Sequence, residues 1–162
     1  MLTALSGKGH TRVNQTQMDL SEALQKGDLQ RVLELLKGLF ASIPYQLHIE
    51  SDAYYHSIFY AVMNVLGFDV DMEVSTSRGR VDAVLELEDR IYIFEFKYKH
   101  CAPDATPETR RKLSGDALEE GMKQIEDRGY ADKYAGVGKT ICKAVFAFLG
   151  RDDIEMTFLT KK

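Results

Sequence analysis

The stretch that most constrains the fold of this chain is GRVDAVLELEDRIYIFEFKYK, residues 79–99. Two runs of β-branched and aromatic residues flank the pair Glu88-Asp89, a pattern typical of a β-hairpin with a two-residue turn. With that turn, Asp82 on the first strand lies opposite Glu95 on the second. A packed core would not select two facing carboxylates, so the pattern predicts a functional site on this hairpin.

Alternation along the two strands assigns each residue to one face of the hairpin. One face is expected to carry Asp82, Val84, Glu86, Ile91, Ile93, Glu95 and Lys97. The other is expected to carry Val81, Ala83, Leu85, Tyr92, Phe94 and Phe96. The charged residues therefore share a face with aliphatic residues, and the second face is wholly apolar.

The facing carboxylates need a compensating charge. At about 5 Å and an effective dielectric constant near 20, their repulsion is on the order of 3 kcal/mol. A divalent cation, Mg²⁺ or Mn²⁺, offsets this well because hard cations prefer oxygen ligands. The expected ligands are Asp82, Glu95 and the backbone carbonyl of Phe96. Lys97, on the same face as Glu95, can direct its ammonium group to that point, where it would stabilise a pentacoordinate phosphate or orient an attacking water.

The remaining periodicities predict the element order helix, three strands, helix, two strands. Expected helices cover 18–41 with an interruption at Gly27, 45–66, and 115–128 after a loop that holds Pro103 and Pro107; expected strands cover 69–75, 80–87, 90–98, 141–150 and 154–160. The fold class is therefore α/β (α+β mixed), with a central mixed sheet of about four or five strands flanked by helices. We expect a leader without periodicity over 1–17, within an N-terminal helical extension over 1–42, and a second domain over 43–162.

Bulk properties exclude several function classes. With 162 residues and 44% hydrophobic content, the chain can form a real core, and its net charge of -4 argues against coating nucleic acid by charge alone. The start lacks a signal peptide and no run of about 18 apolar residues follows, so we expect a soluble, cytoplasmic protein without a membrane segment. Cys101 and Cys142 are too few for a disulfide scaffold or a zinc cluster.

The segment GVGKT, residues 136–140, is similar to the end of a phosphate-binding P-loop. The full motif needs glycine where this chain has Lys133, and it must open a helix, whereas a strand is expected here. We therefore predict no nucleotide cofactor. His56, among the aromatic residues of YYHSIFY, is interpreted as a packing residue.

Asp82 on an apolar strand, followed by a hairpin and by Glu95-Phe96-Lys97, resembles the PD-(D/E)xK nuclease superfamily. The segment STSRGRVDAVLELEDRIYIFEFK is similar to sequences of the branch that is often found C-terminal to an AAA-ATPase-like domain. The resemblance covers about 43–148 and implies a restriction-endonuclease-like core of helix, three strands, helix and strand. One departure is Val81, which stands where the family name has proline.

The resemblance implies a Mg²⁺-dependent nuclease that hydrolyses phosphodiester bonds in DNA or RNA. Asp82, Glu95 and Lys97 would have the roles given above. Glu50, expected in the second helix, would act through metal-bound water, with Glu73 as a competitor for that role. Gln124 on the third helix would orient the phosphate or a site residue.

The expected partner is nucleic acid, DNA in the first place. Basic residues flank the site in sequence and can follow a phosphate backbone, although solvated loops have the same composition. They are Arg78, Arg80, Lys99, Arg110, Arg111 and Lys112, with Tyr98 and His100 beside them. Alternatives are a catalytically silent module that binds nucleic acid or protein, and a regulatory domain whose AAA-ATPase-like partner lies on a longer parent chain or on another protein. Nucleases that cut both strands often pair, so a homodimer is a further arrangement to test.

Overall fold

Five strands form one mixed sheet in the order β1-β2-β3-β4-β5 in a computed structural model, which describes residues 6–151 and 153–162. The strands are β1 (Val70–Thr76), β2 (Gly79–Glu86), β3 (Arg90–Lys99), β4 (Thr140–Leu149) and β5 (Asp153–Lys161). Only the β3–β4 pair is parallel, and the other neighbours are antiparallel. All five predicted strands are confirmed to within one residue at each end.

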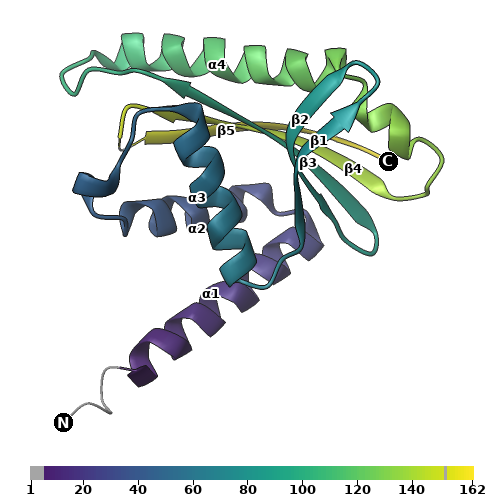
Figure 1. Cartoon of the computed structure of the whole chain (residues 1–162). Coiled ribbons are helices and arrows are strands. Elements are labelled where there is room, and N and C mark those ends of the chain that lie inside the picture. The colour runs from purple at the N-terminus through teal and green to yellow at the C-terminus, as the bar shows by residue number, and fades with distance from the viewer. Residues whose placement is uncertain (1–5, 152) are drawn as a thin grey trace.

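Helices cover both faces of this sheet (Figure 1). They are α1 (Ser6–Lys26), α2 (Leu29–Ala41), α3 (Asp52–Val65) and α4 (Pro107–Asp127), with short 3₁₀ turns at Tyr45–Leu47 and Tyr130–Tyr134. Helix α4 lies on one face and α1, α2 and α3 lie on the other. A parallel strand pair needs a crossover connection, and α4 supplies it between β3 and β4. The mixed α/β class and the N-terminal helical part are confirmed.

None of the helices in the described ranges is both long enough and apolar enough to cross a membrane.

The sheet separates two apolar clusters. The larger one joins α1, α2 and α3 to the sheet face that carries Tyr92, Phe94 and Phe96. The smaller one lies under α4 and includes Ile91 and Ile93. Helices α1 and α2 thus share a core with the sheet, and the division of the chain at residues 42 and 43 stays a prediction.

Helix α4 approaches the sheet closely because its buried stripe consists mainly of small residues. The stripe is Ser114, Ala117, Gly121 and Ile125. A Cβ added at Gly121 would lie 2.4 Å from Cγ1 of Val145 on β4, so only glycine fits without a shift. This close packing sets the height of the helix above β3 and β4.

Two helix starts were predicted wrongly. The second helix begins at Asp52 and not at residue 45, because the Ser51 side chain caps it by accepting from the Tyr54 N–H. Glu50 therefore precedes the helix.

The third helix begins at Pro107 and not at residue 115. Thr106 is its N-cap, and Pro107 occupies the first turn, where its missing N–H costs nothing. Arg110, Arg111 and Lys112 therefore lie on α4 and not in a loop.

The absence of structure predicted for residues 1–17 is also wrong for 6–17, which form the first half of α1, while residues 1–5 lie outside the described part of the chain. This half is polar and carries no apolar stripe, so periodicity could not reveal it. The helix is anchored at its other end, where Leu20 and Leu24 are fully buried.

We predict opposite stability effects for two glycine substitutions on α4. Gly121→Ala should lower the free energy of unfolding by about 1–3 kcal/mol, because the added methyl overpacks against Val145. Gly115→Ala should raise it by about 0.5–1 kcal/mol, because alanine is the better helix former and nothing lies within 4 Å of its Cβ. Urea denaturation measures both changes. Equal effects at the two positions would contradict the close approach of α4.

Candidate active site

Strands β2 and β3 separate at Asp82. The hairpin has the predicted register: Leu87 N–H donates to the Arg90 carbonyl at 2.8 Å, and the ladder then runs to the pair Ala83–Phe94. Beyond that pair the ladder stops, and Oδ2 of Asp82 accepts from the Phe96 N–H at 2.8 Å. A side chain thus replaces the strand partner that β3 would otherwise have had.

The separation leaves an open edge on β3. The N–H and C=O of one strand residue point to the same edge, and this edge alternates along the strand. Since the Phe96 N–H points to Asp82, the Phe96 carbonyl points into the same opening. The expected backbone ligand therefore lies beside the Asp82 carboxylate.

Backbone strain lies next to the separation point. Glu73 on β1 has a φ of 52°, within the left-handed region that side chains other than glycine seldom adopt. The ladder between β1 and β2 omits Glu73 and Asp82, although its register is the same on either side. This break also corrects one prediction, because Val81 packs with the cluster under α4 and not with Ala83 on the other face.

Glu95 is the only charged residue among the described side chains that is fully buried, with 1% of its surface exposed. Nη1 of Arg128 donates to both of its carboxylate oxygens, at 2.9 and 3.0 Å. Burial, and secondly the charge of Asp82, raise the pKa of the Glu95 carboxyl, whereas Arg128 and Lys97 lower it. The predicted repulsion between Asp82 and Glu95 is therefore present, and an arginine compensates it in this structure.

Arg128 is a residue of this site that was not predicted from the sequence. It is the C-cap of α4, four residues after Gln124 and hence on the same side of the helix. The signal that could have found it is the spacing from Gln124, combined with the need of a buried carboxylate for a cation.

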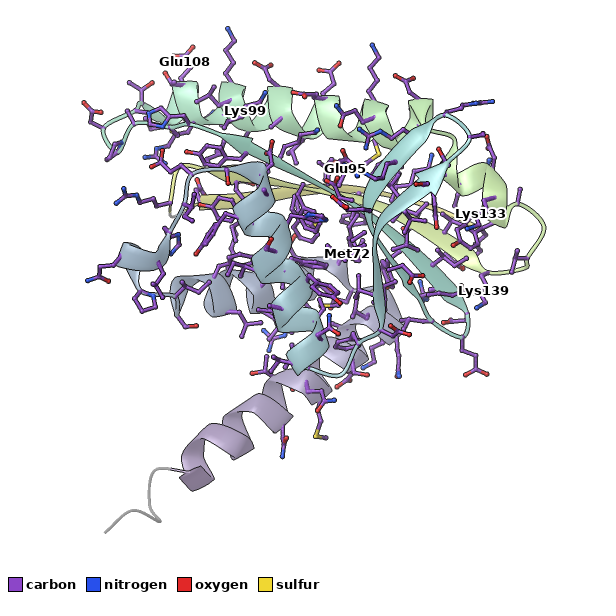
Figure 2. The ribbon with its side chains drawn as sticks, in the orientation of Figure 1. Met72, Glu95, Lys99, Glu108, Lys133 and Lys139 are labelled. Carbon is purple, nitrogen blue, oxygen red and sulfur yellow. The ribbon has the colours of Figure 1, made fainter. Side chains whose placement is uncertain are left out.

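Lys97 and Gln124 are brought together as predicted residues of one site. The Lys97 ammonium lies 3.5 Å from Oε1 of Glu95 and donates to Oε1 of Gln124 at 2.5 Å. Gln124 also accepts from Nη2 of Arg128 at 3.4 Å. Glu120 completes this group at 3.8 Å from Lys97. Figure 2 shows Glu95 under α4. Gln124 and Glu120 on this helix and Arg128 at its C-cap contact Lys97 or Glu95 of β3.

Glu50 has partners of its own at the far end of β3. Its carboxylate accepts from the Tyr98 hydroxyl at 2.9 Å, lies 3.0 Å from Nδ1 of His100, and lies 3.4 Å from Nε of Arg151. The hydrogen bonds from His100 and then Tyr98 lower the pKa of Glu50. No direct contact joins it to Asp82 or Glu95.

Helix α3 brings a different carboxylate to the open edge. Asp52, in its first turn, accepts from the Tyr98 N–H, the next N–H along the edge after that of Phe96. Asp52 and Asp82 therefore cap successive positions on the same edge of β3. The sequence signal was the Ser51-Asp52 pair at the true start of the helix.

The side chain of His56, one turn further along α3, packs against the sheet. Its Nε2 lies 3.0 Å from the Asp82 carbonyl oxygen, and its ring packs against Phe96. The contact with Phe96 agrees with the interpretation of His56 as a packing residue, whereas the contact with the Asp82 carbonyl was not predicted.

The basic residues predicted to bind nucleic acid do not lie together in one patch. Arg78 and Arg80 are exposed at the β1–β2 turn, and Arg80 lies 3.5 Å from Glu73. Lys99 pairs with Glu120 at 2.9 Å (Figure 2 shows Lys99 further along β3). Arg110 donates to carbonyls of the loop before α4, such as that of Pro103 at 3.1 Å. Arg111 and Lys112 are exposed on α4.

The oxygen donors at the open edge fit a hard divalent cation. Two carboxylates, from Asp82 and Glu95, and the Phe96 carbonyl meet there, and such donors suit Mg²⁺ or Mn²⁺. The described residues contain no cluster of three or more acidic, histidine or cysteine side chains that could hold a metal. Water and substrate oxygens would therefore have to complete the coordination of an ion at this place.

Comparisons with known proteins identify a family that is consistent with this fold. A family model described as the PD-(D/E)XK nuclease superfamily matches residues 50–158. A protein of Azotobacter chroococcum mcd 1, named only as an uncharacterized protein in the vnfD 5′ region, is 34% identical over 127 residues. That match covers 75% of this chain but 22% of the relative, so the chain spans about a fifth of its length. No solved structure matches the chain.

The charge of Asp82 should be measurable at Glu95. We predict that Asp82→Asn lowers the pKa of Glu95, because it removes the second-largest cause of the upward shift. A raised carboxyl pKa contributes stability below the unfolded-state pKa, and this contribution is lost as the pH rises through the folded-state value. The variant should therefore lose less stability over that pH range.

Carboxyl ¹³C NMR titration measures the shift. Glu73→Gln, on the neighbouring strand and exposed, is the matched control and should leave the pKa of Glu95 where it is. An unchanged pKa in Asp82→Asn would contradict the proximity of the two carboxylates.

Proposed function

Because this chain belongs to the PD-(D/E)XK nuclease superfamily, we propose that it is a metal-dependent nuclease acting on nucleic acid, DNA in the first place. The observation that supports this most is the opening between β2 and β3. There the carboxylates of Asp82 and Glu95, the Phe96 carbonyl and the Lys97 ammonium come together. A structural core would have no need of such a group.

Asp82, Glu95 and the Phe96 carbonyl would hold Mg²⁺ or Mn²⁺. When bound, the cation supplies Lewis-acid activation of the phosphodiester and of the attacking water. Glu50 would help through a metal-bound water, and Asp52 is a second candidate for this role because it lies on the same strand edge as Asp82.

Lys97 and Gln124 act on the substrate side of this site. The ammonium of Lys97 places a fixed positive charge beside Glu95, where it can stabilise charge that develops on the phosphate. Gln124 holds this ammonium through its side-chain carbonyl, which fixes the direction of the remaining N–H groups. The glutamine therefore positions the lysine and need not contact the substrate.

The basic residues near the site, some exposed and some half-buried, would contact the phosphate backbone. Arg78 lies on the turn that follows β1, and Arg80 lies at the start of β2. This turn is close to the end of α4 that carries Arg128, because the Thr76 hydroxyl donates to the Arg128 carbonyl at 2.9 Å. Lys99, Arg110 and Arg111 would extend the contact along β3 and the start of α4. Each phosphate contact adds to the salt dependence of binding.

A second candidate function is a nuclease-fold module without catalysis, which binds nucleic acid or protein. The contact of Arg128 with both Glu95 oxygens favours it, because a permanent arginine at this place would exclude a cation. A titration with Mn²⁺ separates the two functions: the silent module would show no binding that Asp82→Asn removes.

Association with an AAA-ATPase-like domain and homodimerisation are also part of the proposal. The relative from Azotobacter is several times longer than its matched segment, which is compatible with a nuclease unit inside a larger protein. Size measurement by light scattering tests the dimer.

Purified protein with Mg²⁺ or Mn²⁺ is expected to cut DNA or RNA. Asp82→Ala and Lys97→Ala should each reduce the rate by about 100-fold or more, because the first removes a metal ligand and the second a charge at the reacting phosphate. Cleavage of labelled single- and double-stranded substrates measures the rates.

Asp71→Ala and Lys37→Ala are matched controls. They remove the same charges from exposed positions, Asp71 on β1 and Lys37 on α2. Both should cut as the wild type does. Equal trace cleavage by the wild type and by all four variants would refute the catalytic proposal.

A further inference from the structure

Arg128 binds the Glu95 carboxylate, which a divalent cation at this site would also need as a ligand. Its Nη1 contacts both oxygens of Glu95, and among the described residues only Lys97, at 3.5 Å, shares that carboxylate. Glu95 is nearly fully buried, so water cannot replace either partner freely. A divalent cation at Glu95 and the present contact of Arg128 are therefore alternatives for the same oxygen atoms.

The chain positions Arg128 through four other contacts. Its N–H donates to the Gln124 carbonyl as the C-cap of α4, and its own carbonyl accepts from the Thr76 hydroxyl. Its side chain crosses Gly79, where an added Cβ would lie 3.1 Å from Cγ of Arg128. Nη2 reaches Gln124. The backbone of Arg128 can therefore stay in place while its guanidinium group changes partners.

The need for such a group follows from electrostatics. Without a counter-charge, the carboxylates of Asp82 and Glu95 would repel each other, and burial desolvates that of Glu95. Lys97 alone contacts only one oxygen of Glu95. An arginine that neutralises Glu95 keeps the opening formed when no cation is bound.

We propose that Arg128 is a positioning residue that holds the buried Glu95 carboxylate in place of a divalent cation and competes with that cation for it. This inference rests on the proposed function, because it requires a cation site at Asp82 and Glu95. The cost of breaking the contact between Arg128 and Glu95 then sets the cation affinity. Loss of the arginine strengthens cation binding and weakens the cation-free fold, a combination that a purely structural arginine would not give.

The test is a Mn²⁺ titration by calorimetry without nucleic acid, together with thermal unfolding with and without Mn²⁺. Arg128→Gln should bind Mn²⁺ at least about fivefold more tightly than the wild type, since a charge-assisted contact no longer competes. Its melting temperature should be lower without Mn²⁺ and should rise more on adding Mn²⁺. Arg128→Lys keeps the charge without the guanidinium geometry and should lie between the two, which covers a failure of Arg128→Gln to fold.

Lys143→Gln is the matched control. Lys143 lies on β4 beside Ile93 and pairs with Glu126 of α4 at 3.7 Å, so the change removes the same charge from under the same helix without touching Glu95. It should leave the Mn²⁺ affinity unchanged. If Lys143→Gln gained as much Mn²⁺ affinity as Arg128→Gln, the loss of any nearby positive charge would explain the effect, and the proposal would be overturned.

The remaining outcomes separate this proposal from the proposed function. If the wild type binds Mn²⁺ and the Arg128 variants bind with the same or lower affinity, the competition is refuted and the metal site stands. If neither the wild type nor any Arg128 variant binds Mn²⁺, both are refuted. If only the Arg128 variants bind Mn²⁺, the result would support a competition in which Arg128 excludes the cation from the wild type.

Discussion

The burial of Glu95 beside Asp82 is the constraint on which the site depends. An ionised carboxylate taken out of water is costly unless a charge or several hydrogen bonds compensate it. Arg128 and Lys97 provide that compensation from two different elements, α4 and β3. The end of α4 must therefore lie over the opening between β2 and β3, and the charge balance of the site joins the helix to the hairpin.

The fold accommodates this arrangement by two local compromises. Helix α4 presents Gly121 and other small residues to the sheet, which brings Gln124 and Arg128 within reach of β3. Strand β1 places Glu73 in a left-handed conformation next to the point where β2 leaves β3. Strain of this kind persists where the surrounding structure imposes it, and it commonly lies near functional sites.

Local sequence patterns predicted much of the fold. Alternation and turn chemistry predicted every strand and the hairpin register, because these depend on neighbouring residues. Helix starts failed where a capping residue decided them, as at Ser51 and Thr106, and the polar half of α1 had no stripe to detect. Val81 lies on the other face because alternation is lost where the ladder between β1 and β2 is interrupted at Glu73 and Asp82, which alternation along β2 alone could not show.

The sequence by itself determined the two-residue turn and the hairpin register as far as the pair Ala83–Phe94, because both depend on neighbouring residues. That register brings the charge of Asp82 close to Glu95 and puts Lys97 on the same side as Glu95. The sequence also placed Gln124 on the helix that follows. Only the tertiary structure decided which other groups lie at the site. Arg128 contacts Glu95, and Asp52 lies at the β3 edge. Glu50 contacts Tyr98 and His100, and not Asp82 or Glu95. These choices depend on the height and direction of α3 and α4 over the sheet, which are set by packing between residues far apart in the chain.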